Sequence, residues 1–192
     1  MLSRLSNQFG AWARGWLILA VLAAFIIFMV VTLPSVQAAS DGIEGLDTTF
    51  FYTPEEAYAN IASYPDAGRD VIRNFHVTVD LVNPILYSSF LVLLISWLFR
   101  RGFAQESNLQ KLNLLPLGAA IFDLLENICI FILFSIYPSK LHFVAWLATT
   151  STTLKILWIY ASLVLVLIGL VGTAKNILTK LISAGRTSSV SK

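Results

Sequence analysis

The sequence predicts an all-α membrane protein, a four-transmembrane-helix bundle with a short amphipathic helix in its first outer loop. Two observations predict this fold class. The 192 residues are 57% hydrophobic and 12% charged, whereas soluble domains are about 45–50% apolar and about 25% charged. In addition, the chain contains four apolar runs near the length of roughly 20 residues that a helix needs to cross a bilayer.

The four apolar runs cover residues 16–33, 77–99, 114–136 and 144–171. Each run is continuous rather than a series of short alternating segments, so a β-barrel is not expected. Because backbone polar groups in lipid must be bonded within their own segment, each run is predicted to be a helix. Residues 1–182 then form one membrane domain with an outer loop at 37–76, and the serine-rich residues 183–192 are predicted to be a disordered tail.

Basic residues are distributed unevenly among the predicted loops. The N-terminal segment and the C-terminal tail carry basic residues and no acid, and the connection after the second run carries Arg100, Arg101 and Lys111 against one acid. The loop at 37–76 is instead mostly acidic. Since Lys and Arg close to the spans favour the cytoplasmic side, both termini are predicted to be cytoplasmic and the 37–76 loop to face outward.

The first apolar run has a second interpretation. It follows a basic segment and precedes Val36-Gln37-Ala38, which resembles a signal-peptidase site. The run is long for a signal peptide, so we expect it to stay as a membrane anchor. A mature N-terminus near Ala39 would contradict this expectation, and three spans would then remain.

The outer loop contains a helix-capping motif. Thr53 is suited to the N-cap position, Pro54 to the first helical position and Glu56 to the third. The motif predicts a short helix from Pro54 to about Ser63. This helix either rests on the membrane surface and orders the loop or forms a lid over the bundle, and the sequence leaves both alternatives open.

Polar residues recur through the second run and the segment before it at alternating spacings of three and four. This spacing is typical of one helix face, so a single helix is predicted to begin near residue 66 and continue through the second run. Its polar face consists of Arg69, Arg73, His76, Asp80, Asn83 and Tyr87. The third run adds Asp123, Glu126 and Asn127, and the fourth adds Lys155.

These intramembrane charges are expected to face one another. An ionised residue at the bilayer centre costs about 2.5–3.5 kcal/mol on insertion scales, and the cost falls when charges pair inside a bundle. We therefore expect Lys155 to neutralise Asp123 or Glu126, and Asp80 to pair with His76 or Arg73. The first apolar run carries no comparable polar face, so its helix is expected to be peripheral.

The charged residues support one structural and several functional hypotheses. The structural one is an ion-pair lock that holds three helices in register. The main functional one is a binding or accessory protein, alone or as a subunit of a larger membrane complex, with an outward-opening pocket for a lipid or small amphiphile. The candidate ligand-binding residues are Arg69, Arg73, His76, Asp80, Asn83, Tyr87, Asp123, Glu126, Asn127 and Lys155. Arg69 and Arg73 would suit a phosphate or carboxylate head, unless they pair with Asp66 and Asp70.

Two further functions stay open. A membrane-embedded enzyme would use paired carboxylates for acid–base chemistry on an apolar substrate, with Asp80, Asp123 and Glu126 as candidate catalytic residues. The other is proton or ion transport. Neither a metal nor a cofactor is predicted, because two histidines show no ligand spacing. A net charge of +2 gives no nucleic-acid footprint, so the expected partners are the bilayer, an amphiphile, and a membrane protein or second copy.

Three short strings carry a family resemblance. They are Tyr52-Thr53-Pro54-Glu55-Glu56-Ala57-Tyr58, Ala67-Gly68-Arg69 and Asp123-Leu124-Leu125-Glu126-Asn127. The chain from Tyr52 onward resembles small uncharacterised bacterial membrane proteins with four spans. The resemblance implies a four-span fold and a bacterial plasma membrane, and it implies no activity.

Overall fold

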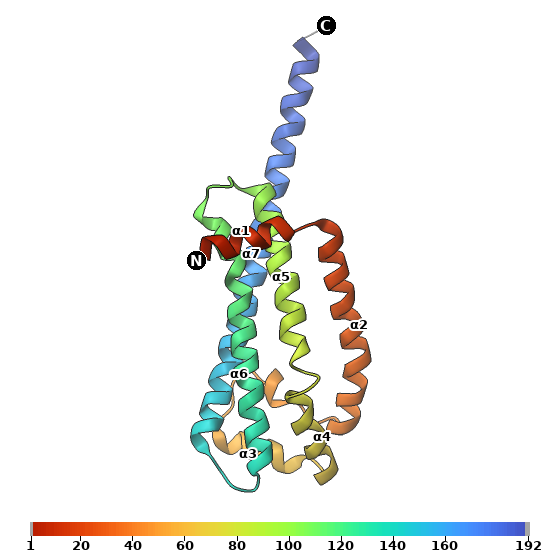
Figure 1. Cartoon of the computed structure of the whole chain (residues 1–192), viewed down its shortest axis with the longest axis vertical. Coiled ribbons are helices and arrows are strands. Elements are labelled where there is room, and N and C mark those ends of the chain that lie inside the picture. The colour runs from red at the N-terminus through yellow and green to blue at the C-terminus, as the bar shows by residue number, and fades with distance from the viewer. Residues whose placement is uncertain (1, 191–192) are drawn as a thin grey trace.

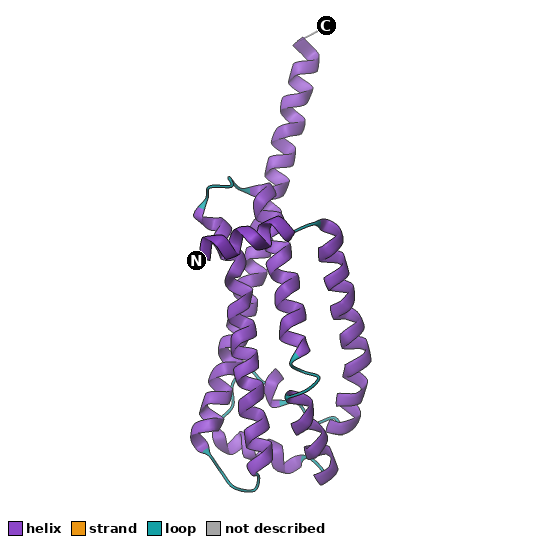
Figure 2. Cartoon of the chain, in the orientation of Figure 1, coloured by secondary structure: helices purple, strands orange, loops and turns teal. Residues whose placement is uncertain are grey.

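The computed structural model describes residues 2–190. Helices and turns make up this part of the chain, with no strand among the described residues (Figure 2). The described residues are 84% helical, and four helical segments among them are long and apolar enough to span a membrane. The predicted fold class, an all-α bundle of four transmembrane helices, is therefore confirmed.

The four spanning segments run side by side along the long axis of the molecule (Figure 1). They are α2 (Gly15–Ser40), α5 (Val82–Gly102), the 3-10 helix η2 (Asn108–Leu114) followed by α6 (Leu115–Ile136), and α7 (His142–Val190). Helix α1 (Leu2–Trp12) crosses one end of the bundle, where both chain termini lie. Helices α3 (Pro54–Ser63) and α4 (Asp66–His76) and the 3-10 helix η1 (Leu46–Thr48) occupy the other end.

Helices α5 and α7 approach each other closely at glycines. A Cβ added to Gly102 would lie 2.9 Å from the backbone nitrogen of Thr173, and one added to Gly169 would lie 2.8 Å from the Cβ of Leu98. Small residues at helix interfaces allow this approach in membranes, where packing replaces the hydrophobic effect as the driving force. The Thr173 hydroxyl also donates to the Leu98 carbonyl at 3.1 Å. The α1 half of the bundle is therefore closed by direct helix contact.

Helix α3 has the bounds that its capping motif predicts. The Thr53 hydroxyl accepts from the Glu56 backbone N–H while the Glu56 carboxylate accepts from the Thr53 backbone N–H. Ala57, Tyr58 and Ile61 are buried, and the Tyr58 hydroxyl accepts a hydrogen bond from the Leu141 backbone N–H at 2.5 Å. Because α3 buries its apolar side against the ends of α6 and α7, it covers the bundle, as the lid alternative requires.

The single helix predicted from residue 66 through the second run is wrong. Helix α4 ends at His76, turns occupy residues 77–81, and α5 begins at Val82. In the interior of a continuous helix, Pro84 would clash with the carbonyl of residue 80 and remove a hydrogen bond to it. The break places Pro84 in the first turn of α5 instead, where a missing N–H is tolerated. The polar residues therefore lie on two helices and a turn.

Helix α2 and the C-terminal end of α7 each test a prediction from the sequence. Helix α2 lies at the edge of the bundle (Figure 1), and only 6% of its most apolar stretch is buried. The prediction of a peripheral first helix is therefore confirmed. At the other end of the chain, α7 is a helix as far as Val190, whereas the sequence predicts a disordered tail over 183–192, and the domain boundary at residue 182 stays a prediction. The segment contains no proline, and serine lowers helix propensity only modestly. Residues 191 and 192 lie outside the described residues.

Candidate functional site

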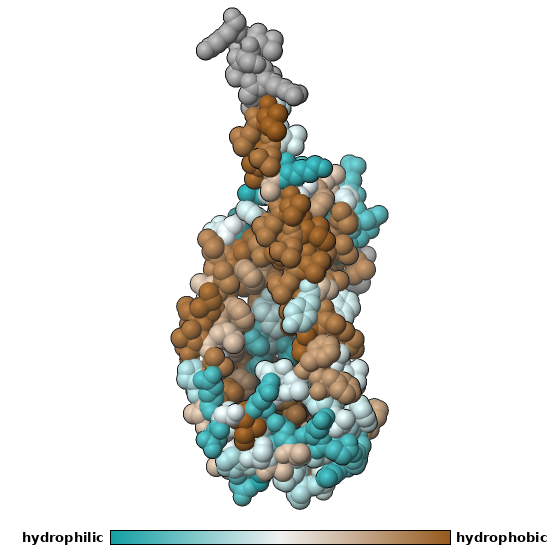
Figure 3. All heavy atoms as spheres, turned by 180° about the vertical axis from the view of Figure 1, so that it is seen from behind, coloured by the Kyte–Doolittle hydropathy of each residue, from teal (hydrophilic) through white to brown (hydrophobic). Residues whose placement is uncertain are grey.

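A cavity of about 240 Å³ lies between α2, α4, the start of α5 and the loop at 40–48. One wall is apolar and includes Phe28, Met29 and Leu33 of α2. The opposite side is polar and includes His76, Asp80, Asn83 and Asp47. In the half of the molecule nearer α3, the rear view shows hydrophilic atoms recessed between hydrophobic surfaces (Figure 3).

His76 and Asp80 form the polar corner of this cavity. His76 Nδ1 lies 2.9 Å from Asn127 Oδ1 and 3.4 Å from Asp80 Oδ2, and both residues are buried. Since both neighbours of Nδ1 are acceptors, this nitrogen carries a proton. Burial alone would lower the pKa of His76, but the hydrogen bond to Asp80 and the charges of Asp47 and Asp80 raise the pKa above its ordinary value. The expected pairing of Asp80 with His76 is confirmed.

Glu126 and Lys155 form a second ion pair, between α6 and α7. The Glu126 side chain is completely buried, and its Oε1 accepts a hydrogen bond from the Thr152 hydroxyl at 2.5 Å. Lys155 Nζ also donates to the backbone carbonyl of Asp47 at 2.9 Å. The expected neutralisation of Glu126 by Lys155 is therefore confirmed, and protein groups surround the pair.

Asp123 lies between these two pairs. Its Oδ2 accepts a hydrogen bond from the Tyr87 hydroxyl at 2.9 Å, which joins α5 to α6, and its Oδ1 lies 3.5 Å from Asn127 Nδ2. Because Asn127 also contacts His76, Asp123 is linked to the polar corner of the cavity through one side chain.

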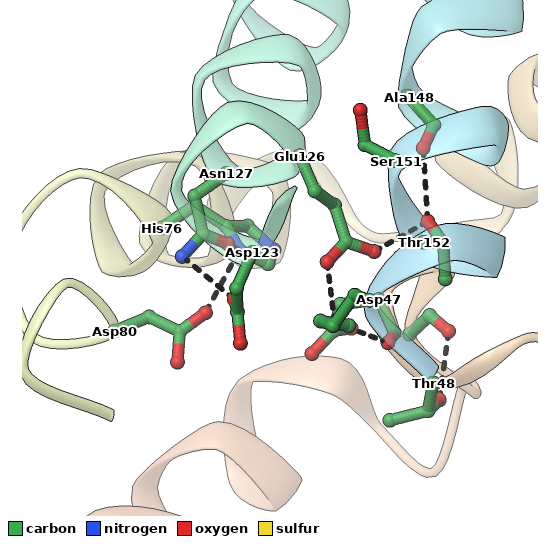
Figure 4. Close-up of polar contacts among 12 residues, drawn as sticks. Asp47, Thr48, His76, Asp80, Asp123, Glu126, Asn127, Ala148, Ser151 and Thr152 are labelled. Atoms are coloured by element: carbon green, nitrogen blue, oxygen red, sulfur yellow. Dashed lines mark hydrogen bonds and ion pairs between the residues drawn. The ribbon is translucent and has the colours of Figure 1, made fainter. Parts of the chain in front are cut away.

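Asp47 is the residue that sequence reasoning missed. It lies in η1, and its charge interacts with His76, Asp123, Glu126 and Lys155. Figure 4 shows Asp47 and Asp80 on opposite sides of one space, with Asp123 and Glu126 reaching toward it from α6. The available signal was Leu46, an apolar residue in a polar loop, which is buried in the core and anchors η1 against the bundle.

Arg69 and Arg73 bind local partners. Arg69 pairs with Asp66, donates to the Tyr64 carbonyl at 2.6 Å, and places its guanidinium carbon 5.0 Å from the centre of the Tyr137 ring. Arg73 Nη1 lies 3.0 Å from Asp70 Oδ1. Neither arginine lines the cavity, so these contacts favour the alternative in which Asp66 and Asp70 neutralise them.

The sequence-predicted site residues thus fall into three groups. His76, Asp80 and Asn83 line the cavity, and Arg69 and Arg73 lie outside it. The remaining candidates form a network of polar contacts beside the cavity: Tyr87, Asp123, Glu126, Asn127 and Lys155. Within the described residues, no group of three or more His, Cys, Asp or Glu side chains is arranged to hold a metal ion.

No protein-family model, curated protein or solved structure matches the chain. The function must therefore be inferred from the cavity and its charges. The resemblance to bacterial four-span proteins stays an expectation, and it adds nothing about activity.

Proposed function

We propose that this chain is an integral membrane binding protein whose cavity between α2, α4 and α5 holds a lipid or a small amphiphile. The observation that carries the proposal is the two-sided lining of the cavity, with an apolar wall from α2 facing the polar corner of His76 and Asp80. Binding sites for small molecules are characteristically concave and mostly apolar, with a few polar groups that fix the orientation of the ligand. An amphiphile satisfies both sides of such a site.

The proposed orientation places the cavity in the outer half of the bilayer. Both termini lie at the α1 end of the bundle (Figure 1), and this end also carries Arg14, Arg100 and Arg101 around α1. The positive-inside rule then supports a cytoplasmic α1 end and an outward-facing α3 end. A bacterial plasma membrane is the setting implied by the resemblance.

An accessory role is a variant of the same proposal. Helix α2 exposes large apolar side chains such as Leu19, Ile27 and Val30, and this surface suits lipid as well as a neighbouring membrane protein. Native mass spectrometry of the protein released from its membrane shows by mass whether lipid or another protein chain is bound. A partner chain or second copy supports the accessory role, and a monomer with bound lipid supports an independent binding protein.

An enzyme is the second candidate, favoured by one observation. Asp80 and His76 lie together at the cavity wall, where an acid and a base within reach of a ligand are the minimum for proton transfer. Glu126 offers less to this hypothesis because it is enclosed by Lys155 and Thr152. Conversion of a co-purified ligand by the wild type but not by Asp80→Asn would establish the enzyme.

The binding proposal is tested by filling the cavity. Leu33 lines the apolar wall, so Leu33→Trp places a large ring in the space that the ligand body would occupy. Leu19→Trp is the matched control, because Leu19 lies on the same helix and is exposed, as Leu33 is, but does not line the cavity. We expect mass spectrometry to find an amphiphile on the wild type and on Leu19→Trp that is lost from Leu33→Trp. The same lipids on all three proteins would overturn the proposal.

A further inference from the structure

The charges around the cavity are unbalanced. Four carboxyl groups interact with one another here, those of Asp47, Asp80, Asp123 and Glu126 (Figure 4). Among the described residues, the basic groups that form ion pairs with these carboxyl groups are Lys155, at Glu126, and the imidazole of His76, at Asp80. Four acids against one lysine leave a formal charge of −3 when His76 is neutral and −2 when it is protonated. An unpaired charge within a membrane is costly, so the cluster favours the uptake of positive charge.

The arginines that would have reduced this imbalance lie elsewhere. Arg69 and Arg73 pair with Asp66 and Asp70 on α4 and do not line the cavity. Lys155 is held by Glu126 and by the Asp47 carbonyl. The polar side of the cavity is therefore acidic, and a phosphate or carboxylate head would face Asp47 and Asp80 with no lysine or arginine in the lining.

Two simpler cations match the cavity less well. A proton can neutralise a carboxylate, but it does not use the apolar wall of a space of about 240 Å³. A metal ion needs several ligands converging at bonding distance, and the described His, Cys, Asp and Glu side chains offer no such group of three. An organic cation with an apolar body uses both sides of the cavity.

The hydrogen-bonding capacity of the polar corner favours an ammonium that carries N–H groups. Asn83 lines the cavity, and its buried Oδ1 has no hydrogen-bond partner among the described residues. Asp80 Oδ2 lies 3.4 Å from its imidazole neighbour, which is long for a charged pair. A primary ammonium supplies three donors to such acceptors, whereas a quaternary ammonium supplies none.

We propose that the cavity binds amphiphiles with a primary ammonium head, held at Asp80 and Asp47, and an apolar body laid against α2. This inference rests on the proposed binding function and adds the charge of the ligand. Because hydrogen bonds between charged groups are roughly twice as strong as neutral ones, the head group dominates the selectivity.

The test compares three probes with the same chain, which are decylammonium, decanol and decyl phosphate. Saturable binding is measured on the full chain in nanodiscs of phosphatidylcholine, which has no net charge, and binding to empty nanodiscs is subtracted. We expect decylammonium to bind roughly tenfold or more tightly than decanol, and decyl phosphate to bind most weakly. We expect Leu33→Trp to lose saturable binding of decylammonium.

Three variants locate the charge selectivity. Asp80→Asn and Asp47→Asn each remove one carboxylate while keeping the shape of the side chain, and each should reduce the preference for decylammonium over decanol. Asp47→Asn keeps the backbone carbonyl that Lys155 uses, so it serves if Asp80→Asn fails to fold. Asp41→Asn is the matched control, since Asp41 is an exposed acid of the same loop that does not line the cavity. It should leave the preference unchanged.

The outcomes separate this inference from the binding function. Equal binding of decylammonium and decanol, both lost in Leu33→Trp, would overturn the charge assignment and keep the binding function. Tighter binding of decyl phosphate would do the same. A preference for decylammonium that survives in both Asp80→Asn and Asp47→Asn would also overturn the assignment. The absence of saturable binding of every probe would overturn the binding function itself.

Discussion

The two buried ion pairs of this protein differ in what surrounds them. Glu126 and Lys155 join α6 to α7 and are enclosed by Thr152 and by the Asp47 carbonyl. His76 and Asp80 flank the end of α4 and line a cavity of about 240 Å³. One pair is completed by protein, whereas the other faces space that protein does not fill. The difference supports the proposal of a binding site beside a structural lock, although the sequence alone does not distinguish the two pairs.

The largest expected effect is the loss of the enclosed lock. Lys155→Met leaves the fully buried Glu126 without its cation, and breaking a buried pair from one side costs about 3–5 kcal/mol. We expect this loss in the free energy of unfolding, measured by denaturant titration in detergent micelles. Lys175→Met, at an exposed position of α7, is the control, and equal losses in the two variants would contradict a lock.

The same comparison is sharpened by removing both charges of the lock. Lys155→Met combined with Glu126→Gln no longer buries an unpaired charge, so the double variant should recover a large part of the stability that Lys155→Met loses. A double variant that is no more stable than Lys155→Met alone would show that Lys155 and Glu126 are not coupled.

A smaller effect is expected between the two pairs, at Asp123. Tyr87→Phe removes the hydroxyl that donates to Asp123 Oδ2 at 2.9 Å. Loss of one hydrogen bond to a buried carboxyl costs about 1–3 kcal/mol, again measured as a free energy of unfolding. Tyr160→Phe removes an exposed hydroxyl on α7 and should cost nearly nothing. If the two variants are equally stable, Tyr87 does not support Asp123.

The pairing of His76 with Asp80 at the cavity should make the free energy of unfolding depend on pH. The pKa of His76 is raised in the folded protein, while an unfolded histidine has a pKa of about 6.5. Its contribution is therefore fully present below about pH 6.5 and is lost as the pH rises through the folded pKa. Asp80→Asn removes the carboxylate that accepts the hydrogen bond from His76 and helps to raise its pKa. The stability that His76 contributes should therefore be lost at lower pH in this variant. Unfolding measured from pH 6 to 9 tests this, with His142→Gln as the control at an exposed histidine. An unchanged profile in Asp80→Asn would contradict the pairing.

The smallest effect is expected at the arginines. Arg73 pairs with Asp70 near the surface of α4, and such pairs contribute about 0–1 kcal/mol. Arg73→Gln should therefore change the free energy of unfolding by less than about 1 kcal/mol and leave the binding of decylammonium unchanged. Weaker binding of decyl phosphate in this variant, measured in the same nanodiscs, would show that Arg73 contributes to the binding site.

Local sequence rules predicted the elements that local interactions determine. The capping motif from Thr53 to Glu56 defined α3 because its hydrogen bonds lie within one helical turn. The long apolar runs defined the spans because the bilayer demands them. The pairing of Lys155 with Glu126 followed from the high cost of unpaired charge in a membrane.

The features that the sequence did not predict correctly depend on contacts between segments that are distant along the chain. The spacing from Arg69 to Tyr87 fitted one helix, yet Pro84 was better placed in the first turn of a second helix. Asp47 joined the charged residues because Leu46 anchors its loop in the core, which no local pattern of charges reveals. The cavity itself exists because α2 contributes its wall from the edge of the bundle.

The most direct test of the division into lock and site measures binding and stability on the same two proteins. The affinity for decylammonium and the free energy of unfolding are determined for Asp80→Asn and for the Lys155→Met, Glu126→Gln double variant. The account predicts that Asp80→Asn loses roughly tenfold or more in affinity, whereas the double variant, which leaves the summed charge of the cluster unchanged, loses much less. Unchanged affinity in Asp80→Asn, together with lost affinity in a folded double variant, would contradict it.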